Sequence, residues 1–178
     1  MILTIDVTMD YALEPGDPVL LMIAVLPSDV QTLLHADLHA QGARLHWLEQ
    51  AGAAGQRVWV LPEGARLQAA YRARVDITRR APALQSLSAA PMHALPTQAL
   101  TALRPSLFCP SDRFGPFVQD QFGHLAGGAR VAAMSDWVAG HLRYVPGASG
   151  PSTTALDTFV TRQGVCRDYA HLLCALAR

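Results

Sequence analysis

The first eighty residues alternate between hydrophobic and polar positions in short segments that are separated by turn-forming residues. The alternation is clearest in residues 65–78, where Leu67, Tyr71 and Val75 belong to one apolar face of an extended strand. The other segments follow the same plan, with strands at 4–13, 19–26, 34–48 (folded about a turn at 41–42) and 57–61, and turns at 14–18, 52–55 and 62–64. Short strands at this spacing are typical of an antiparallel sandwich, which we predict for residues 1–80.

Residues 81–125 show no sustained periodicity and predict a connector. Five of the twelve prolines fall between residues 80 and 111, which argues against long helices and central strands there. A short helical turn fits around 98–103, and Ser111 can begin a second short helix if Pro116 lies in its first turn. We expect this Pro-rich connector to lie over the surface.

Residues 126–178 change to a helical period. In the first helix the apolar residues recur at three- and four-residue steps, at Val131, Met134, Val138 and Leu142. A Pro- and Gly-containing loop follows at 144–150, and Thr154 with Asp157 forms a capping-box pattern that begins the next helix. That helix should end near Gly164, which suits the left-handed residue after a helix. Cys166 then lies in the first turn of a last helix that runs to residue 178.

The position of Cys166 carries a specific chemistry. A thiol in the first turn of a helix faces unpaired backbone N–H groups and the positive end of the helix dipole, and both favour the nucleophilic thiolate. The same N–H groups can stabilise the oxyanion that forms when the thiolate attacks a carbonyl carbon. Gly164, two residues earlier, leaves room for a substrate backbone. This pattern suits acyl transfer through a thioester.

The residues around Cys166 resemble the nucleophile segment of bacterial transglutaminase-like cysteine enzymes. The resemblance rests on Arg-x-Gly-x-Cys at 162–166, on Asp-x-Ala-x-Leu at 168–172, on Tyr-x-Pro-Gly at 144–147, and on the connector motifs at 103–106 and 109–112. It implies a papain-like catalytic core with Cys166 as nucleophile, and a β-rich domain before that core. The fold class expected is therefore α+β, an antiparallel β-sandwich followed by the helical first part of a transglutaminase-like core.

The resemblance also implies catalytic partners that lie further along the chain. The family's core continues past the nucleophile helix into a sheet that supplies a His and then an Asp. His171 is a poor substitute, because five residues along one helix turn its side chain about 140° away from Cys166. We therefore expect residues 1–178 to hold an incomplete triad and to be inactive, either as part of a longer protein or as a truncated module.

Two kinds of function follow from these observations. The first is an enzyme that transfers an acyl group from a protein or peptide amide to water or an amine, with hydrolysis preferred over cross-linking. Tyr144 and Gly164 are its candidate substrate-binding residues. The second is a non-catalytic interaction module that retains a remnant core. A histidine and an aspartate encoded downstream favour the first, and a natural stop codon after Arg178 favours the second.

Composition excludes several other classes. The 14 basic and 14 acidic residues balance without a basic run, so we expect no nucleic acid and no membrane partner. No ligand-spaced cluster of residues predicts a metal, and we expect no cofactor. Three cysteines without a disulfide pattern, and no secretory signal, favour the cytoplasm. The last helix is apolar nearly all round, which predicts self-association through it, and Cys174 is expected to pack beneath Cys166.

Overall fold

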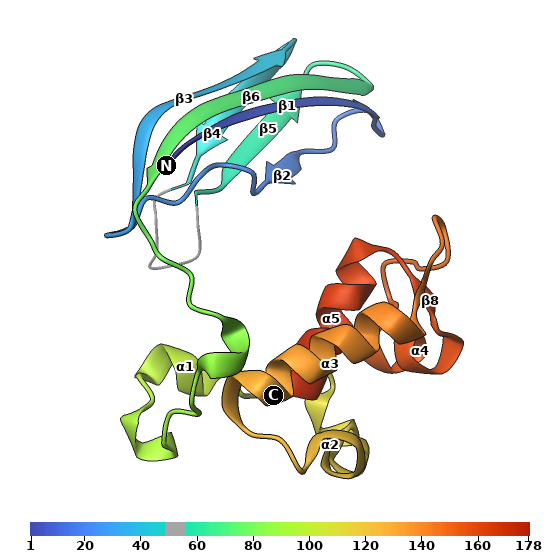
Figure 1. The fold of residues 1–178 in the computed structure, drawn as a ribbon. Helices are drawn as coiled ribbons and strands as arrows, with labels where there is room; N and C mark the ends of the chain where they lie inside the picture. Colours follow the sequence, from blue (N-terminus) through green and yellow to red (C-terminus); the bar gives the residue numbers. More distant parts are fainter. Residues whose placement is uncertain (49–55) are drawn as a thin grey trace. The chain divides into compact units, whose positions relative to one another are not determined.

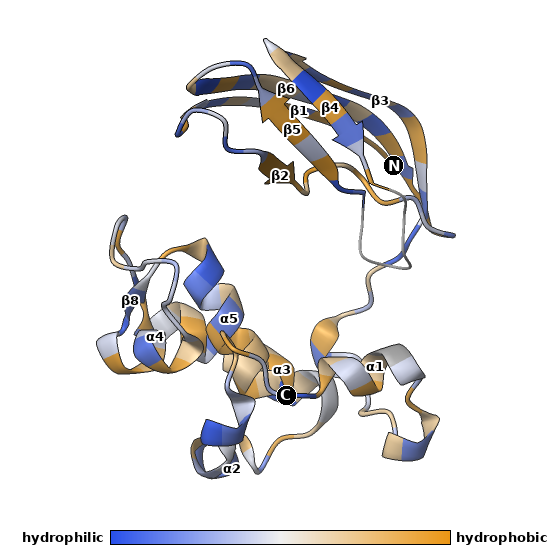
Figure 2. Ribbon diagram, turned by 180° about the vertical axis from the view of Figure 1, so that it is seen from behind, coloured by the Kyte–Doolittle hydropathy of each residue, from blue (hydrophilic) through white to orange (hydrophobic). Residues whose placement is uncertain are grey.

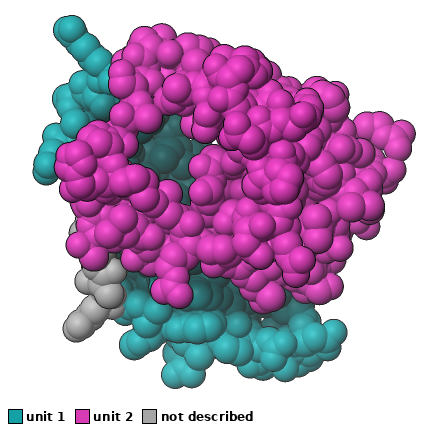
Figure 3. Space-filling view, turned by 90° about the horizontal axis from the view of Figure 1, so that it is seen from below, with its two compact units in different colours: residues 1–80 teal, residues 81–178 magenta. Residues whose placement is uncertain are grey.

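The computed structural model describes residues 1–48 and 56–178. The predicted turn at 52–55 falls outside these ranges. The chain divides into two compact units, residues 1–80 and 81–178 (Figures 1 and 3). Within the described ranges, no helix combines the length and the apolar character that crossing a membrane requires.

In the first unit, the described residues 1–48 and 56–80 form six strands in two antiparallel sheets. One sheet has the order β1-β6-β3 and the other has the order β2-β5-β4 (Figure 1). The strands are β1 (Ile2–Ala12), β2 (Val19–Leu21), β3 (Gln31–Gln41), β4 (Ala43–Trp47), β5 (Val58–Pro62) and β6 (Arg66–Ile77). The predicted antiparallel strands are confirmed, and the turn at 41–42 is the short β3–β4 connection, where Gly42 has a φ of 58°.

Strand β6 holds this unit together because its alternation matches the pleat. Every second residue from Leu67 to Val75 is buried, whereas the residues that alternate with them are exposed or half-buried. The Tyr71 hydroxyl accepts a hydrogen bond from the Val25 N–H at 2.9 Å, which satisfies its polar end inside the core. A hydrophobic cluster joins residues from both sheets, and in Figure 2 the apolar strands β2 and β5 stand out in orange.

The second unit is mainly helical. Its helices are α1 (Thr97–Ala102), α2 (Gly115–Phe122), α3 (Gly127–His141), α4 (Ala155–Thr161) and α5 (Cys166–Ala177). Three single 3₁₀ turns lie before α2, namely η1 (Leu84–Ser86), η2 (Met92–Ala94) and η3 (Ser111–Arg113), and two short strands, β7 (Arg143–Tyr144) and β8 (Gln163–Gly164), flank α4. The α+β fold class, with antiparallel sheets followed by helices, is confirmed.

The core of the second unit draws on the predicted connector as well as on the helices. Cys109, Phe114 and Phe122 are buried in the same cluster as residues of α3 and α5, so part of the segment 81–125 is interior rather than laid over the surface. Helix α2 begins at Gly115, not Ser111, because residues 111–113 form a 3₁₀ turn. Pro116 lies in the first turn of α2, as predicted.

Two adjacent glycines attach η1 to the start of α3. Gly127 has a φ of 54°, and the Gly128 N–H donates to the Leu87 carbonyl at 2.8 Å. A Cβ on Gly128 would lie 1.7 Å from the Leu84 carbonyl oxygen, so no side chain fits there. The glycine pair therefore permits direct backbone contact between the connector and α3.

Candidate functional site

Two short strands, β7 before α4 and β8 after it, pair with each other close to the start of α5. Strands β7 and β8 run parallel, and Tyr144 pairs with Gly164. The Arg143 N–H donates to the Arg162 carbonyl at 2.9 Å, and the Val145 N–H donates to the Gly164 carbonyl at 3.0 Å. The pairing brings one end of the 144–150 loop beside the residues that lead into Cys166.

Helix α4 begins as the sequence predicts. The Thr154 N–H donates to the Asp157 carboxylate at 2.9 Å, and the Asp157 N–H donates back to the Thr154 hydroxyl at 3.3 Å. These two bonds form a complete capping box, and they satisfy two backbone donors that the helix itself cannot use. Hydrogen bonds from Thr154 hold the pKa of the Asp157 carboxyl below its usual value.

The end of α4 differs from the prediction. The left-handed residue is Arg162, with a φ of 57°, and not Gly164. The Arg162 guanidinium carbon lies 4.2 Å from the centroid of the Phe159 ring and 4.6 Å from that of Trp137. These cation–π contacts stabilise a residue whose backbone conformation would otherwise favour glycine, and local spacing gives no sign of them.

Gly164 is required for a different reason than the one predicted. It is buried, and a Cβ at this position would lie 2.6 Å from the Asp168 Cβ and 2.9 Å from an Asp168 carboxylate oxygen. The space beside Gly164 is therefore filled by Asp168. Its role as a substrate contact stays a prediction.

Cys166 is the first residue of α5, and its thiol is exposed. The residue before it, Val165, occupies the cap position, where a side chain normally accepts a hydrogen bond from the first turn. Valine has no oxygen and cannot do so. In the described part of the chain, no acceptor is found for the N–H groups of Cys166 and Arg167, which are therefore free beside the thiol.

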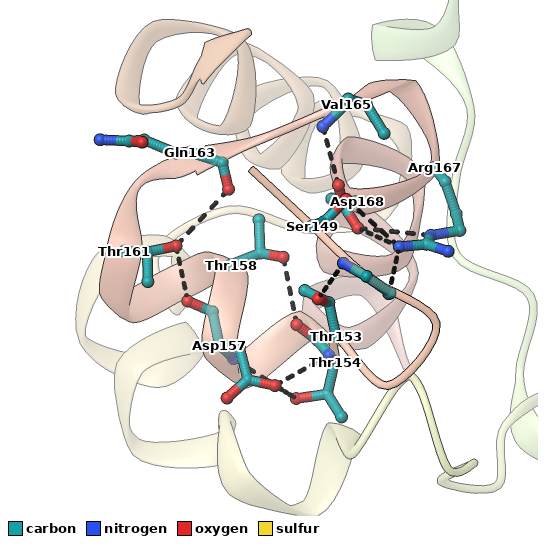
Figure 4. A network of polar contacts seen from close by, with 11 residues as sticks. Ser149, Thr153, Thr154, Asp157, Thr158, Thr161, Gln163, Val165, Arg167 and Asp168 are labelled. Carbon is teal, nitrogen blue, oxygen red and sulfur yellow. Dashed lines mark hydrogen bonds and ion pairs between the residues drawn. The ribbon is translucent and has the colours of Figure 1, made fainter. Parts of the chain in front are cut away.

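Asp168 stabilises this helix start from inside. Its carboxylate is 1% exposed and accepts the Val165 N–H at 2.7 Å. The other carboxylate oxygen pairs with the Arg167 guanidinium at 3.3 Å. Arg167 in turn donates to the Ser149 hydroxyl at 3.2 Å and to the Gly150 carbonyl at 2.9 Å, so the network reaches the loop before α4 (Figure 4).

This network keeps the buried carboxylate charged. Burial alone raises the pKa of Asp168, but hydrogen bonds from Ser149, Val165 and Arg167, together with the Arg167 charge, outweigh it and hold the pKa below the usual value. A buried carboxylate is tolerated here because it is hydrogen-bonded and paired with a guanidinium.

The remaining candidate residues lie around α5. Tyr144 is 60% exposed, and its ring centroid lies 6.4 Å from that of Tyr169, a residue of the helix that Cys166 begins. The His171 ring stacks on Phe108 at 5.6 Å and its Nδ1 is buried with no partner among the described residues. No hydrogen bond or ion pair within those residues reaches the Cys166 thiol.

The predicted packing of Cys174 beneath Cys166 is wrong. Cys166, Ala170 and Cys174 share a helix face as expected, but all three are exposed. Helix α5 instead buries the face that carries Leu172 and Leu176, which joins the core of the second unit. Two exposed thiols therefore stand at opposite ends of one helix face.

Sequence reasoning missed the role of Asp168 as a cap. A capping box is recognised by Ser or Thr at the cap position. Val165 does not match this pattern, although an acid, Asp168, is present three residues later. The contact of Arg167 with residues 149–150 spans a long stretch of chain, and no local signal predicts it. Among residues 1–48 and 56–178, no group of three or more potential ligands is arranged to hold a metal ion.

The chain is similar to a known protein family and to a solved structure. The family model of the transglutaminase-like superfamily matches residues 118–178. A 1.9 Å crystal structure of a proposed cysteine protease from Cytophaga hutchinsonii has a similar fold, with a TM-score of 0.80 and 24% sequence identity over 98% of this chain. The match covers 65% of that protein's chain. No curated protein matches the sequence. The similarity to the transglutaminase-like superfamily thus covers residues 118–178, the segment that contains Cys166.

Proposed function

We propose that Cys166 is the nucleophile of an acyl-transfer reaction on amide or ester carbonyls. One observation carries this proposal: the exposed Cys166 thiol lies in the first turn of α5, where the backbone N–H groups of Cys166 and Arg167 have no acceptor among the described residues. Cys166 also lies inside residues 118–178, the segment that matches the superfamily model. A thiolate beside unpaired N–H groups supplies both the nucleophile and the stabilisation of the oxyanion.

The chemistry proceeds in two steps. The Cys166 thiolate adds to the carbonyl carbon, the carbonyl oxygen becomes an oxyanion near the free N–H groups of Cys166 and Arg167, and the bond to the leaving amine or alkoxide breaks to give a thioester. Water or an amine then adds to the thioester carbonyl, and the sulfur leaves as thiolate. Protonation of the amine and activation of the water both need a base that can also act as an acid.

Hydrolysis of a protein or peptide amide is our preferred reaction. The structurally similar Cytophaga hutchinsonii protein is named as a proposed cysteine protease, which supports a peptidase over a cross-linking enzyme. Tyr144 is a candidate substrate contact, since its ring is exposed and lies 6.4 Å from that of Tyr169, a residue of the helix that Cys166 begins. Exposed aromatic rings suit contact with a peptide chain.

The catalytic base is the part of the mechanism that the described residues do not provide. His171 stacks on Phe108, and no histidine among those residues is hydrogen-bonded to the thiol. The family resemblance predicts a His and an Asp beyond the nucleophile helix. We therefore expect residues 1–178 to form a thioester with an activated substrate but not to release it at an enzymatic rate.

The first test compares two thiols of the same helix. Cys166 and Cys174 are both exposed, but Cys166 begins α5 and Cys174 lies in its last turn. Cys166 therefore lies at the positive end of the helix dipole, and Cys174 lies near its negative end. We expect iodoacetamide to modify Cys166 about two- to five-fold faster than Cys174 at neutral pH, as measured by peptide mass spectrometry.

Buried Cys109 serves as the control for folding during this experiment. It is 6% exposed and should react only after denaturation. Equal rates at Cys166 and Cys174 in folded protein would contradict the proposed activation of Cys166.

A second candidate function is self-association through α5. The exposed face of this helix carries Ala170, Cys174 and Ala177, while its leucines at 172 and 176 are buried within the unit. The exposed apolar area is therefore smaller than the sequence alone predicts, and we expect only weak association. Light scattering over a concentration series measures it, and a monomer at every concentration would count against this contact.

A further inference from the structure

We propose that Asp168 is a positioning residue for the nucleophile, and that Arg167 extends its effect to the 149–150 loop. The proposal rests on the proposed function of Cys166. It assigns to Asp168 the task of holding the first turn of α5 so that the Cys166 and Arg167 N–H groups stay free and fixed.

The cap at the start of α5 is unusual. A Ser, Thr, Asp or Asn at the position of Val165 would accept an N–H from the first turn of the helix. The Val165 side chain cannot accept a hydrogen bond. Instead, the Val165 backbone N–H donates to the Asp168 carboxylate at 2.7 Å, and this bond stabilises the start of the helix. The Val165 carbonyl takes the N–H groups of Asp168 and Tyr169, at 2.8 and 3.2 Å.

The consequence is a division of the backbone donors. The N–H groups of Val165, Asp168 and Tyr169 donate to acceptors at the start of the helix. The N–H groups of Cys166 and Arg167 have no acceptor among the described residues. The two remaining donors belong to the nucleophile itself and to the residue after it. An oxyanion formed by attack of the Cys166 sulfur therefore arises close to both.

Arg167 links Asp168 to the loop before α4. The Arg167 guanidinium bridges the Asp168 carboxylate and the residues Ser149 and Gly150, and its side chain is 42% exposed. The Asp168 side chain is 1% exposed, so its carboxylate is held inside the unit. The Arg167 guanidinium makes the contact with the loop (Figure 4). The same loop begins at Tyr144, so Asp168 connects a candidate substrate contact with the nucleophile.

The stabilisation of an oxyanion is sensitive to the geometry of its donors. Donors act only when they lie about 2.7–3.1 Å from the oxyanion, and displacements of about 1 Å cost large factors in rate. Simple alkylation has no such requirement, because iodide leaves from a CH₂ group and no oxyanion forms. A loss of positioning at Cys166 should therefore affect acylation more than alkylation.

The test measures both reactions at Cys166 in the same 178-residue chain. In acylation by p-nitrophenyl acetate, the thiolate adds to the ester carbonyl and nitrophenolate leaves. In alkylation by iodoacetamide, a sulfur–carbon bond forms and iodide leaves. Both reactions consume the same thiolate, so the ratio of the two rates cancels the thiolate population and reports the oxyanion stabilisation.

We expect Asp168→Ala to lower this ratio about tenfold, because it removes the carboxylate that holds Val165 and Arg167. Asp168→Asn keeps the size and one acceptor for the Val165 N–H but loses the ion pair, and we expect a fall of about three-fold. Arg167→Ala cuts only the link to the loop and should lower the ratio by about two-fold.

The matched control is Asp157→Asn. Asp157 is the acid of the capping box of α4, at the same helix position as Asp168 in α5, and it is exposed. Its replacement should lower the melting temperature without changing the ratio. If Asp168→Ala does not fold, Asp168→Asn and Arg167→Ala still decide the question.

The outcomes separate this proposal from the one on which it rests. A ratio that falls in the Asp168 variants and not in Asp157→Asn supports positioning. A ratio unchanged in the Asp168 variants, with the original chain acylated at Cys166, overturns positioning and leaves the nucleophile in place. An original chain that is not acylated at Cys166 overturns both.

Discussion

Mixing residues 1–178 with p-nitrophenyl acetate should release about one nitrophenolate per chain in a burst and place one acetyl group on Cys166. Cys166→Ala should lower the rate of the burst by about 100-fold or more, because the nucleophile and the thioester are both lost. Cys166→Ser should behave similarly, since a hydroxyl without a neighbouring base is a weak nucleophile at neutral pH. Absorbance of nitrophenolate and intact-mass spectrometry measure the two quantities.

The control for this prediction is Cys174→Ala. It removes the other exposed thiol and should leave the burst unchanged. A burst that persists in Cys166→Ala and disappears in Cys174→Ala would contradict the nucleophile assignment. Sustained turnover of an amide that disappears in Cys166→Ala would instead contradict our expectation that residues 1–178 lack the catalytic base.

Gly164→Ala is expected to destabilise the second unit by about 1–3 kcal/mol, as overpacking of a filled site does. The new Cβ would lie 2.6 Å from the Asp168 Cβ, and Asp168 cannot move aside without losing the Val165 N–H and the Arg167 guanidinium. Denaturant unfolding monitored by circular dichroism measures the change. The same substitution should slow acylation of Cys166, because it displaces the carboxylate that we propose positions the nucleophile.

Gly140→Ala is the matched control for the change at Gly164. Gly140 lies in α3, and a Cβ there meets no atom within 4 Å. Alanine at this helical position should leave stability unchanged or raise it by about 0.5–1 kcal/mol. Equal stability of the two variants would show that the space beside Gly164 is not filled as the structure has it.

Local patterns in the sequence determined much of the secondary structure. The alternation around Leu67 and Val75 determines β6, because a strand with one buried face needs an apolar residue at every second position. The Thr154–Asp157 box determines the start of α4, and the apolar residues after Cys166 determine α5. In each case the groups that decide the structure lie within a few residues of one another.

Tertiary contacts decided the rest. Arg162 adopts the left-handed conformation in place of Gly164 because Trp137 and Phe159, on two different helices, hold its guanidinium. Cys174 is exposed because the packing of the second unit selects the Leu172 face of α5, a choice that the nearly uniform apolar sequence of the helix leaves open.

The same division applies to the candidate site. The sequence by itself places Cys166 at a helix start, since the signals for that helix are local. Which backbone donors remain free beside the thiol depends on Asp168, because its carboxylate accepts the Val165 N–H. The buried carboxylate is stabilised by Arg167, which is itself held by hydrogen bonds to Ser149 and Gly150 in the loop before α4. The helix that carries the nucleophile is therefore a property of the sequence, and the geometry around the thiol is a property of the fold, because it depends on contacts between residues far apart in the chain.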